Sequence, residues 1–185
     1  SDDRDVERAV HGPARSHGWS RAVSAAARCR LPRMKPMTPV ELDFFERAPM
    51  RVTVTATVPA PPATVFAAFA DPGDWTRWWP MMHRAAWTKG AGGVGSERAV
   101  ALRLFGRFEE RFIAWEPGAR FAFTMIASTS PMATQMAEDY RLTAVDGGTR
   151  IDWTMAAAPS GLGRAMRPAL TRVLGRMGRQ AFRRL

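Results

Sequence analysis

Apolar and polar residues alternate through the middle of the chain. Positions 52, 54, 56 and 58 are apolar and threonines lie between them, so a strand with one buried face is predicted at residues 51–58. Six further strands are predicted at residues 83–88, 96–104, 107–115, 120–127, 134–145 and 149–157. Short connectors containing Gly, Pro, Asp or Ser separate these six strands. Because such turns join antiparallel neighbours, the chain should form a seven-stranded antiparallel sheet.

Two short helices and one long helix complete the predicted fold. The short helices, at residues 64–70 and 74–79, follow the first strand, and each is ended by a proline. The last segment has helical periodicity, and Pro168 inside it should cause a kink. Its apolar positions are Leu162, Met166, Leu170, Val173, Leu174 and Met177. The predicted class is α+β: a seven-stranded antiparallel sheet followed by a long amphipathic C-terminal helix.

The region before residue 50 is less regular. Residues 1–36 have no sustained period, so we expect a disordered extension, or one that arises from a start placed too far upstream. Residues 37–49 should form a short N-terminal helix, because Thr38 can cap it, Pro39 suits its first turn and Glu41 completes a capping box. The domain itself is expected at residues 50–185.

Composition narrows the class of protein. Hydrophobic residues make up 46% of the chain and charged residues 24%, and no apolar run is long enough to cross a bilayer. The polar N-terminus lacks the apolar stretch of a signal peptide. Cys29 is the one cysteine, so no internal disulfide or cysteine-built metal site is possible. We therefore expect a cytoplasmic protein.

The net charge of +10 is concentrated at the C-terminus. Residues 159–185 contain seven arginines and no acidic residue, which accounts for +7 of the total. A solvated helix face is one interpretation, and a surface for phosphates or anionic lipids is the other. Phe182 is the one aromatic residue among these arginines, and single-strand binding normally needs several. We expect weak anionic-surface binding and no specific nucleic acid.

Four local motifs resemble the START-like, or SRPBCC, superfamily, which includes lipid-transfer domains, plant pollen allergens and the polyketide cyclase/dehydrase family. The motifs are VPAPPATVF at residues 58–66, DPGDWTRWWP at 71–80, FEERFIAWEP at 108–117, and the last hairpin at 140–153. The resemblance covers residues 50–185 and implies a helix-grip fold with a cavity between sheet and helix. It does not specify the function, because the superfamily uses this scaffold for binding, transport and catalysis.

Alternate residues of each strand should face this cavity. The inward positions are largely apolar, and Leu104 is assigned to the same face as Val100. We expect a cavity of roughly 300–1,000 Å³, with Phe112, Phe123, Tyr140, Trp153 and Met166 around one continuous space. The full predicted ligand-binding set is Trp78, Arg98, Val100, Leu102, Phe108, Glu110, Phe112, Phe121, Phe123, Met125, Met136, Glu138, Tyr140, Trp153, Met155, Met166 and Leu170.

Three charged residues share this inward face: Arg98, Glu110 and Glu138, with the Tyr140 hydroxyl nearby in sequence. A buried charge must be paired or change its pKa. One interpretation is structural, with Arg98 paired to a glutamate at a partly hydrated strand end. A second is that these residues orient a ligand carbonyl or hydroxyl. A third is acid/base catalysis by Glu110 or Glu138.

Three functions remain open from the sequence. The leading hypothesis is a non-enzymatic protein that binds a lipid, polyketide, steroid or similar small hydrophobic molecule. The alternative is a polyketide cyclase or aromatase that uses polar cavity residues. Nucleic-acid or membrane-surface binding through the arginine-rich helix is the third. No cofactor motif is present, and His11, His17 and His83 lack metal-ligand spacing, so no cofactor or metal is predicted.

Overall fold

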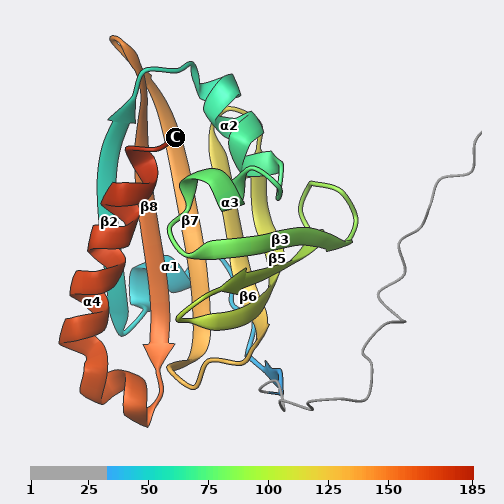
Figure 1. The fold of residues 1–185 in the computed structure, drawn as a ribbon, viewed down its shortest axis with the longest axis vertical. Helices are drawn as coiled ribbons and strands as arrows, with labels where there is room; N and C mark the ends of the chain where they lie inside the picture. The colour runs from blue at the N-terminus through green and yellow to red at the C-terminus, as the bar shows by residue number, and fades with distance from the viewer. Residues whose placement is uncertain (1–32) are drawn as a thin grey trace, which may run out of the picture. The chain divides into compact units, whose positions relative to one another are not determined.

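The computed structural model describes residues 33–185, which form a curved antiparallel sheet with helices on both faces (Figure 1). The hydrogen-bonded order is β2-β8-β7-β6-β5-β4-β3, so the first long strand lies beside the last. This order confirms the predicted antiparallel meander. The long strands are β2 (Met50–Val58), β3 (Met82–Lys89), β4 (Glu97–Leu102), β5 (Gly106–Glu116), β6 (Arg120–Ser128), β7 (Ala133–Val145) and β8 (Gly148–Pro159).

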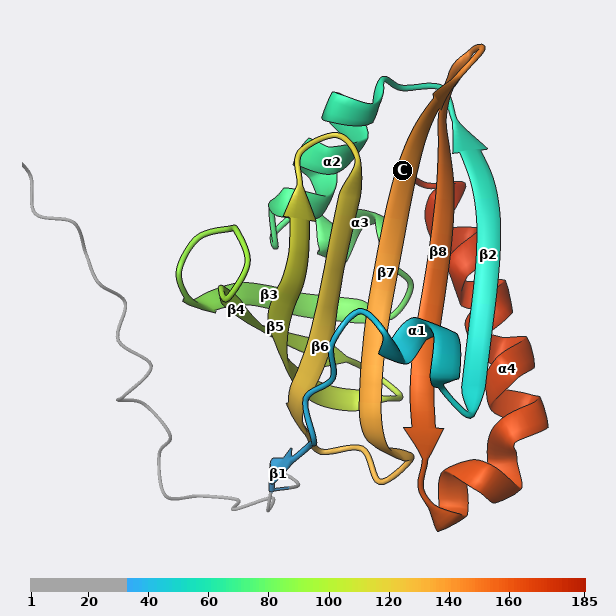
Figure 2. The same cartoon turned by 180° about the vertical axis from the view of Figure 1, so that it is seen from behind.

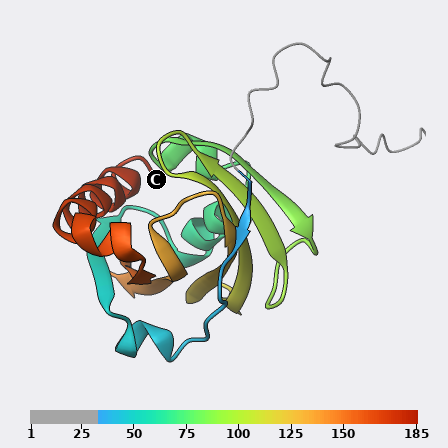
Figure 3. The same ribbon diagram turned by 90° about the horizontal axis from the view of Figure 1, so that it is seen from below.

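Three helices cover the inner face of the sheet, as predicted. They are α2 (Pro62–Ala70), α3 (Trp75–Trp78) and the long C-terminal α4 (Gly161–Phe182). Figure 3 shows the sheet curling around this inner layer, which is the helix-grip arrangement. Pro168 lies inside α4, and Figures 1 and 2 show the first turns of α4 inclined to the rest.

A glycine sets the distance between α4 and the sheet. A Cβ atom on Gly178 would lie 2.5 Å from the Trp153 ring and 3.3 Å from a Val54 methyl carbon. Only a residue without a side chain permits this approach. One turn earlier, a Cβ atom on Gly175 would meet its neighbours at 3.6 Å or more, which is ordinary contact. The C-terminal half of α4 is therefore fixed closely to β2 and β8.

The segment before β2 differs from the prediction. Lys35–Pro36 forms an additional strand, β1, which pairs with Ala127 and Ser128 of β6 and makes the sheet eight-stranded. The segment continues between β6 and β7, where Thr38 donates its amide to the carbonyl of Thr134. The disorder predicted for residues 1–36 is therefore wrong for this short strand. Residues 1–32 lie outside the described residues.

The predicted helix at residues 37–49 is also shorter than expected. Only Phe44–Arg47 is helical (α1), and its N-cap is Asp43, not Thr38. The residues before the turn at Leu42 and Asp43 are not helical, and some of their amides bond to the sheet: Val40 donates to the Thr124 hydroxyl at 3.0 Å. These sheet contacts replace the capping box that the sequence offered.

This segment covers part of the outer face of the sheet (Figure 2). Phe44 and Phe45 of α1 pack with Val40 against Ala137 and Ala156 and form a second small core. The alternation had assigned the outer face to solvent, but this covering layer buries part of it.

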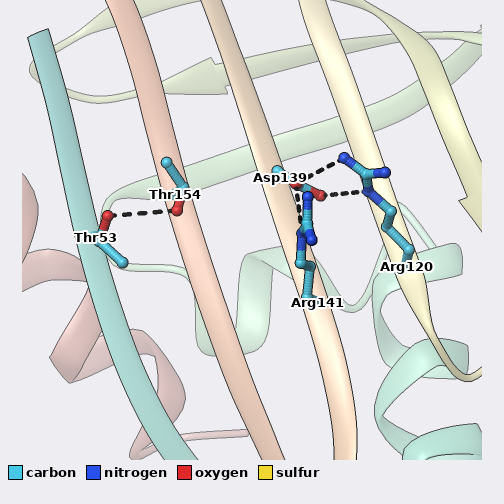
Figure 4. Close-up of polar contacts among 5 residues, drawn as sticks. All are labelled: Thr53, Arg120, Asp139, Arg141 and Thr154. Carbon is cyan, nitrogen blue, oxygen red and sulfur yellow. Dashed lines mark hydrogen bonds and ion pairs between the residues drawn. The ribbon is translucent and has the colours of Figure 1, made fainter. Parts of the chain in front are cut away.

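The outer face also carries a buried ion cluster. Asp139 is 3% exposed, and its carboxylate accepts hydrogen bonds from Arg120 at 2.9 and 3.0 Å and from Arg141 at 3.1 Å (Figure 4). Thr53 and Thr154 pair across β2 and β8 on the same face at 3.4 Å. Asp139 is therefore buried although it lies on the outer face of the sheet, because two arginines cover it.

The predicted strand at residues 96–104 extends too far. β4 ends at Leu102, and Leu104 lies in the following turn with 79% of its surface exposed. It therefore does not face inward.

In residues 33–185, no helix has the length and apolar character needed to cross a membrane.

Candidate ligand-binding site

Aromatic rings fill the half of the inner space beneath α2 and α3. Ring centroids lie 4.5 Å apart for Trp75 and Trp78 and 4.9 Å apart for Phe112 and Phe121. Rings at these distances in edge-to-face or tilted arrangements leave little free volume. We call this set the aromatic cluster; it comprises Phe66, Phe69, Trp75, Trp78, Trp79, Phe112, Trp115, Phe121, Phe123, Tyr140, Trp153 and Phe182.

A pocket of about 90 Å³ occupies the other half of the inner space. It lies where β6 and β8 end and β7 begins, and the middle of α4 contributes Leu170 and Leu174. The pocket is smaller than the predicted range because long side chains project into it. We call it the methionine pocket, after Met37, Met50, Met82, Met125, Met132, Met136, Met155 and Met177, which line it.

The structure divides the predicted ligand-binding residues into two groups. Those that line the methionine pocket are Leu102, Phe108, Glu110, Phe123, Met125, Met136, Glu138, Met155 and Leu170. The others are buried outside it, except for Met166: Trp78, Arg98, Val100, Phe112, Phe121, Tyr140 and Trp153. Alternation correctly assigned those on strands, all except Trp78, to the inner face, but it carries no information on where the helices cover that face. Met166 is 41% exposed on α4, so its predicted inward position is wrong.

Several pocket residues were not predicted from the sequence. Met37 reaches the pocket because β1 and the following residues insert beside β6, which no local periodicity indicates. Trp75 and Trp79 line the pocket in place of Trp78. The remaining unpredicted residues are Met50, Met82, Phe105, Ser128, Ser130, Met132, Ala133, Ala157, Pro159, Leu174 and Met177. Of these, Met50, Ala157, Leu174 and Met177 continue the inward alternation or the helix period, so the pattern contained their signal.

Arg98 and Glu110 form a buried ion pair between the aromatic cluster and the pocket. They are direct cross-strand neighbours, and Arg98 Nε donates to Glu110 Oε2 at 2.6 Å. Arg98 is 0% exposed and its guanidinium lies 4.2 Å from the Trp75 ring centroid, a cation–π contact. Its two terminal nitrogens have no hydrogen-bond partner. Burial raises the pKa of Glu110, and the charge of Arg98 opposes that rise. Arg98 does pair with a glutamate, as one interpretation of the sequence expected, but the pair is buried and not at a partly hydrated strand end.

Glu138 is the second carboxyl group at the pocket. The Tyr140 hydroxyl donates to its Oε2 at 2.6 Å, and the Trp153 indole nitrogen donates to the same oxygen at 3.0 Å. Burial raises the pKa of Glu138 to about 7, although the hydrogen bond from Tyr140 acts in the opposite direction. Burial also raises the pKa of Tyr140 well above its ordinary value, so the phenol stays protonated and remains a donor. Glu138 can therefore exchange a proton near neutral pH.

The chemistry of the site follows from this arrangement. An apolar pocket holds one carboxyl group paired with Arg98 and a second, on Glu138, whose Oε2 oxygen is fixed by two donors. In residues 33–185, no group of three or more His, Cys, Asp or Glu side chains is placed to hold a metal ion. The described residues thus suit an apolar molecule with a hydroxyl or carbonyl group.

The fold and the internal pocket define a START-like, or SRPBCC, helix-grip protein. Residues 49–185 match the model of one family in that superfamily, described as polyketide cyclase/dehydrase and lipid transport. The match covers most of the chain, so this protein belongs to that family.

Relatives and solved structures agree with this assignment. An uncharacterized protein of Mycobacterium tuberculosis is 37% identical over 138 residues, which span 74% of this chain and 81% of that protein. The crystal structure of a Chromobacterium violaceum protein has a TM-score of 0.57 at 19% identity, covering 74% of this chain and 94% of that one. The Zhui aromatase/cyclase from a Streptomyces species has a TM-score of 0.53 at 19% identity, covering 63% and 72%. At these identities the structures show a shared fold alone.

Proposed function

We propose that this protein binds a small apolar molecule with one hydroxyl or carbonyl group in the methionine pocket, with that group at Glu138. The observation that carries the proposal is an apolar pocket in which the Glu138 carboxyl group is held on one oxygen by Tyr140 and Trp153. The apolar side chains that line the pocket would contact the apolar part of the ligand. Glu138 would bind the ligand's hydroxyl or carbonyl group and so fix its orientation.

The methionine side chains reconcile the small pocket with ligand binding. A pocket of about 90 Å³ accepts only a very small molecule as it stands. Thioether side chains have three rotatable bonds and repack at low cost, so eight of them can move to fit a larger ligand. Membership of a family named for lipid transport and polyketide cyclases supports this class of ligand.

The test compares two small aromatic probes that differ by one hydroxyl group. We expect 2-naphthol to bind more tightly than naphthalene, and Glu138→Gln to remove much of this difference. A hydrogen bond to a charged group contributes roughly 1.5–3 kcal/mol, so the loss should be about tenfold or more in affinity. Glu109→Gln is the matched control, because Glu109 belongs to β5 but does not line the pocket. If neither 2-naphthol nor naphthalene binds, the proposal is contradicted.

A cyclase or aromatase activity is the second candidate. The specific observation in its favour is that the pKa of Glu138 is raised to about 7, near the value that suits a general acid/base at neutral pH. The fold shared with an aromatase/cyclase is consistent with it. Loss of turnover of a defined polyketide chain in Glu138→Gln, with probe affinity and melting temperature unchanged, would favour this candidate over the carrier.

A further inference from the structure

α4 exposes an apolar strip between its first turn and its middle. Leu162 is 49% exposed, and Met166 and Val173 are each 41% exposed. With 3.6 residues per turn, positions 162, 166 and 173 point within about 40° of one another. Apolar side chains aligned in this way on one helix differ from isolated exposed residues, which are normal on a protein surface.

A stripe of arginines runs along the neighbouring side of α4. Arg172, Arg176, Arg179 and Arg183 are spaced by four, three and four residues, so they also share one side of the helix. All four are exposed, and no ion pair within residues 33–185 involves them. Their direction lies about a quarter turn from the apolar strip. The stripe begins at Arg172, beside Val173 where the apolar strip ends, and continues to the C-cap Arg183, so uncompensated positive charge follows the apolar surface along the helix.

The methionine pocket lies on the other side of the strip. Leu170, Leu174 and Met177 line the pocket, and their direction on the helix is about 70° from that of the apolar strip. Going around α4, the order is therefore the pocket-facing side, the apolar strip and the arginine stripe. A helix that lies in a membrane interface has this arrangement, with apolar side chains at the acyl boundary and arginines at the phosphates.

We propose that the apolar strip and arginine stripe of α4 dock on the surface of an anionic lipid bilayer, which places the methionine pocket beside the membrane. Charge complementarity selects anionic lipid, and the exposed apolar side chains select a bilayer over a nucleic acid. Phe182, the one aromatic residue of α4, is 3% exposed and cannot stack on bases. Docking of this kind does not depend on which ligand the pocket holds.

The experiment is co-sedimentation of the full chain with phosphatidylcholine vesicles, with and without phosphatidylglycerol, at about 0.15 M salt. We expect binding only to the vesicles that contain phosphatidylglycerol. Arg172→Gln/Arg176→Gln/Arg179→Gln should weaken it roughly a hundredfold, since each arginine near an anionic surface contributes about fivefold. The matched control is Arg47→Gln/Arg77→Gln/Arg150→Gln, which removes the same charge from ion-paired arginines outside α4 and should have little effect.

The apolar strip is tested separately. Met166→Ser/Val173→Ser should weaken vesicle binding by about tenfold, because two partly exposed apolar side chains no longer enter the interface. Val94→Ser is the control, since Val94 is 69% exposed in the connection between β3 and β4. Circular dichroism checks that each variant remains folded.

Several results would overturn docking. They are no vesicle binding, equal binding to neutral vesicles, binding to duplex DNA without binding to vesicles, and a dimer in solution that Met166→Ser abolishes. Binding of 2-naphthol without vesicles reports on the pocket alone, so failure of docking and failure of the proposed ligand site give different results.

Discussion

The two halves of the space between the sheet and the helices have the same strand alternation but opposite packing. In the aromatic cluster, rings from α2, α3 and the sheet touch one another, and Phe121 and Trp153 are 0% exposed. In the methionine pocket, thioethers from central and edge strands, two connecting segments and α4 surround free volume. The difference shows that residue type and helix placement, not alternation, decide which part of an inner face is solid core and which part is a site.

The two halves meet at the buried Arg98–Glu110 pair, which should give the largest effect on stability. Arg98→Met leaves Glu110 buried without its cation, and we expect a loss of about 3–5 kcal/mol in the free energy of unfolding. Arg111→Met is the matched control on the same two strands, because its pair with Glu97 is partly exposed and should contribute less than about 1 kcal/mol. Urea unfolding gives the free energy of unfolding of both variants and of the unaltered protein. Equal losses would mean that burial of the pair has no energetic consequence.

Truncations within each half test the comparison directly. Phe121→Ala should cost about 3–5 kcal/mol, because it removes a fully buried ring from close neighbours. Met136→Ala should cost only about 1 kcal/mol, since this half-buried side chain already borders free space and loses fewer contacts. The measurement is again urea unfolding. A loss for Met136→Ala as large as that for Phe121→Ala would show that the pocket half is packed as tightly as the aromatic half.

Glu138 should make stability depend on pH. Its pKa is raised from 4.5 to about 7 in the folded protein, so between these values the folded state binds more protons than the unfolded state. The free energy of unfolding should therefore fall as pH rises from 4.5 to about 7, by roughly 3 kcal/mol, and then level off. Glu110, whose pKa is also raised, acts in the same direction.

The variant Glu138→Gln isolates this contribution. The amide cannot ionise, so we expect most of the fall in stability between pH 4.5 and 7 to disappear, while Glu109→Gln retains it. Thermal unfolding across this pH range is the measurement. An unchanged pH profile in Glu138→Gln would contradict the raised pKa.

The smallest effects concern the contact between α4 and the sheet. Gly178→Ala should destabilise the fold by about 1–3 kcal/mol, because its methyl group would overlap the Trp153 ring. Gly175→Ala should be neutral or stabilising by up to about 1 kcal/mol, since its site has room and alanine favours the helix. Melting temperatures of the two variants suffice. Destabilisation by Gly175→Ala alone would mean that the register of α4 is different.

The sequence predicted most of the fold but a smaller part of the site. Period-two and helical patterns predicted the seven long strands, the two short helices and α4, because one face of each element must be buried. They also placed Arg98, Glu110 and Glu138 on the inner face, but they did not decide which glutamate pairs with Arg98. They could not locate the pocket, which depends on how far α2 and α3 extend over the sheet. Long-range pairing also placed β1 beside β6 and brought Met37 to the pocket, which no local pattern encodes.

The most direct test of the central claim is NMR of ¹³C-methyl-labelled methionine during addition of 2-naphthol. The chain has 11 methionines, and eight of them line the pocket. We predict chemical-shift changes at pocket methionines such as Met125, Met136 and Met155, and none at Met81 or Met166, which lie outside it. Single Met→Leu variants assign the signals. Unchanged pocket signals, or changes confined to Met81 and Met166, would contradict binding in the methionine pocket.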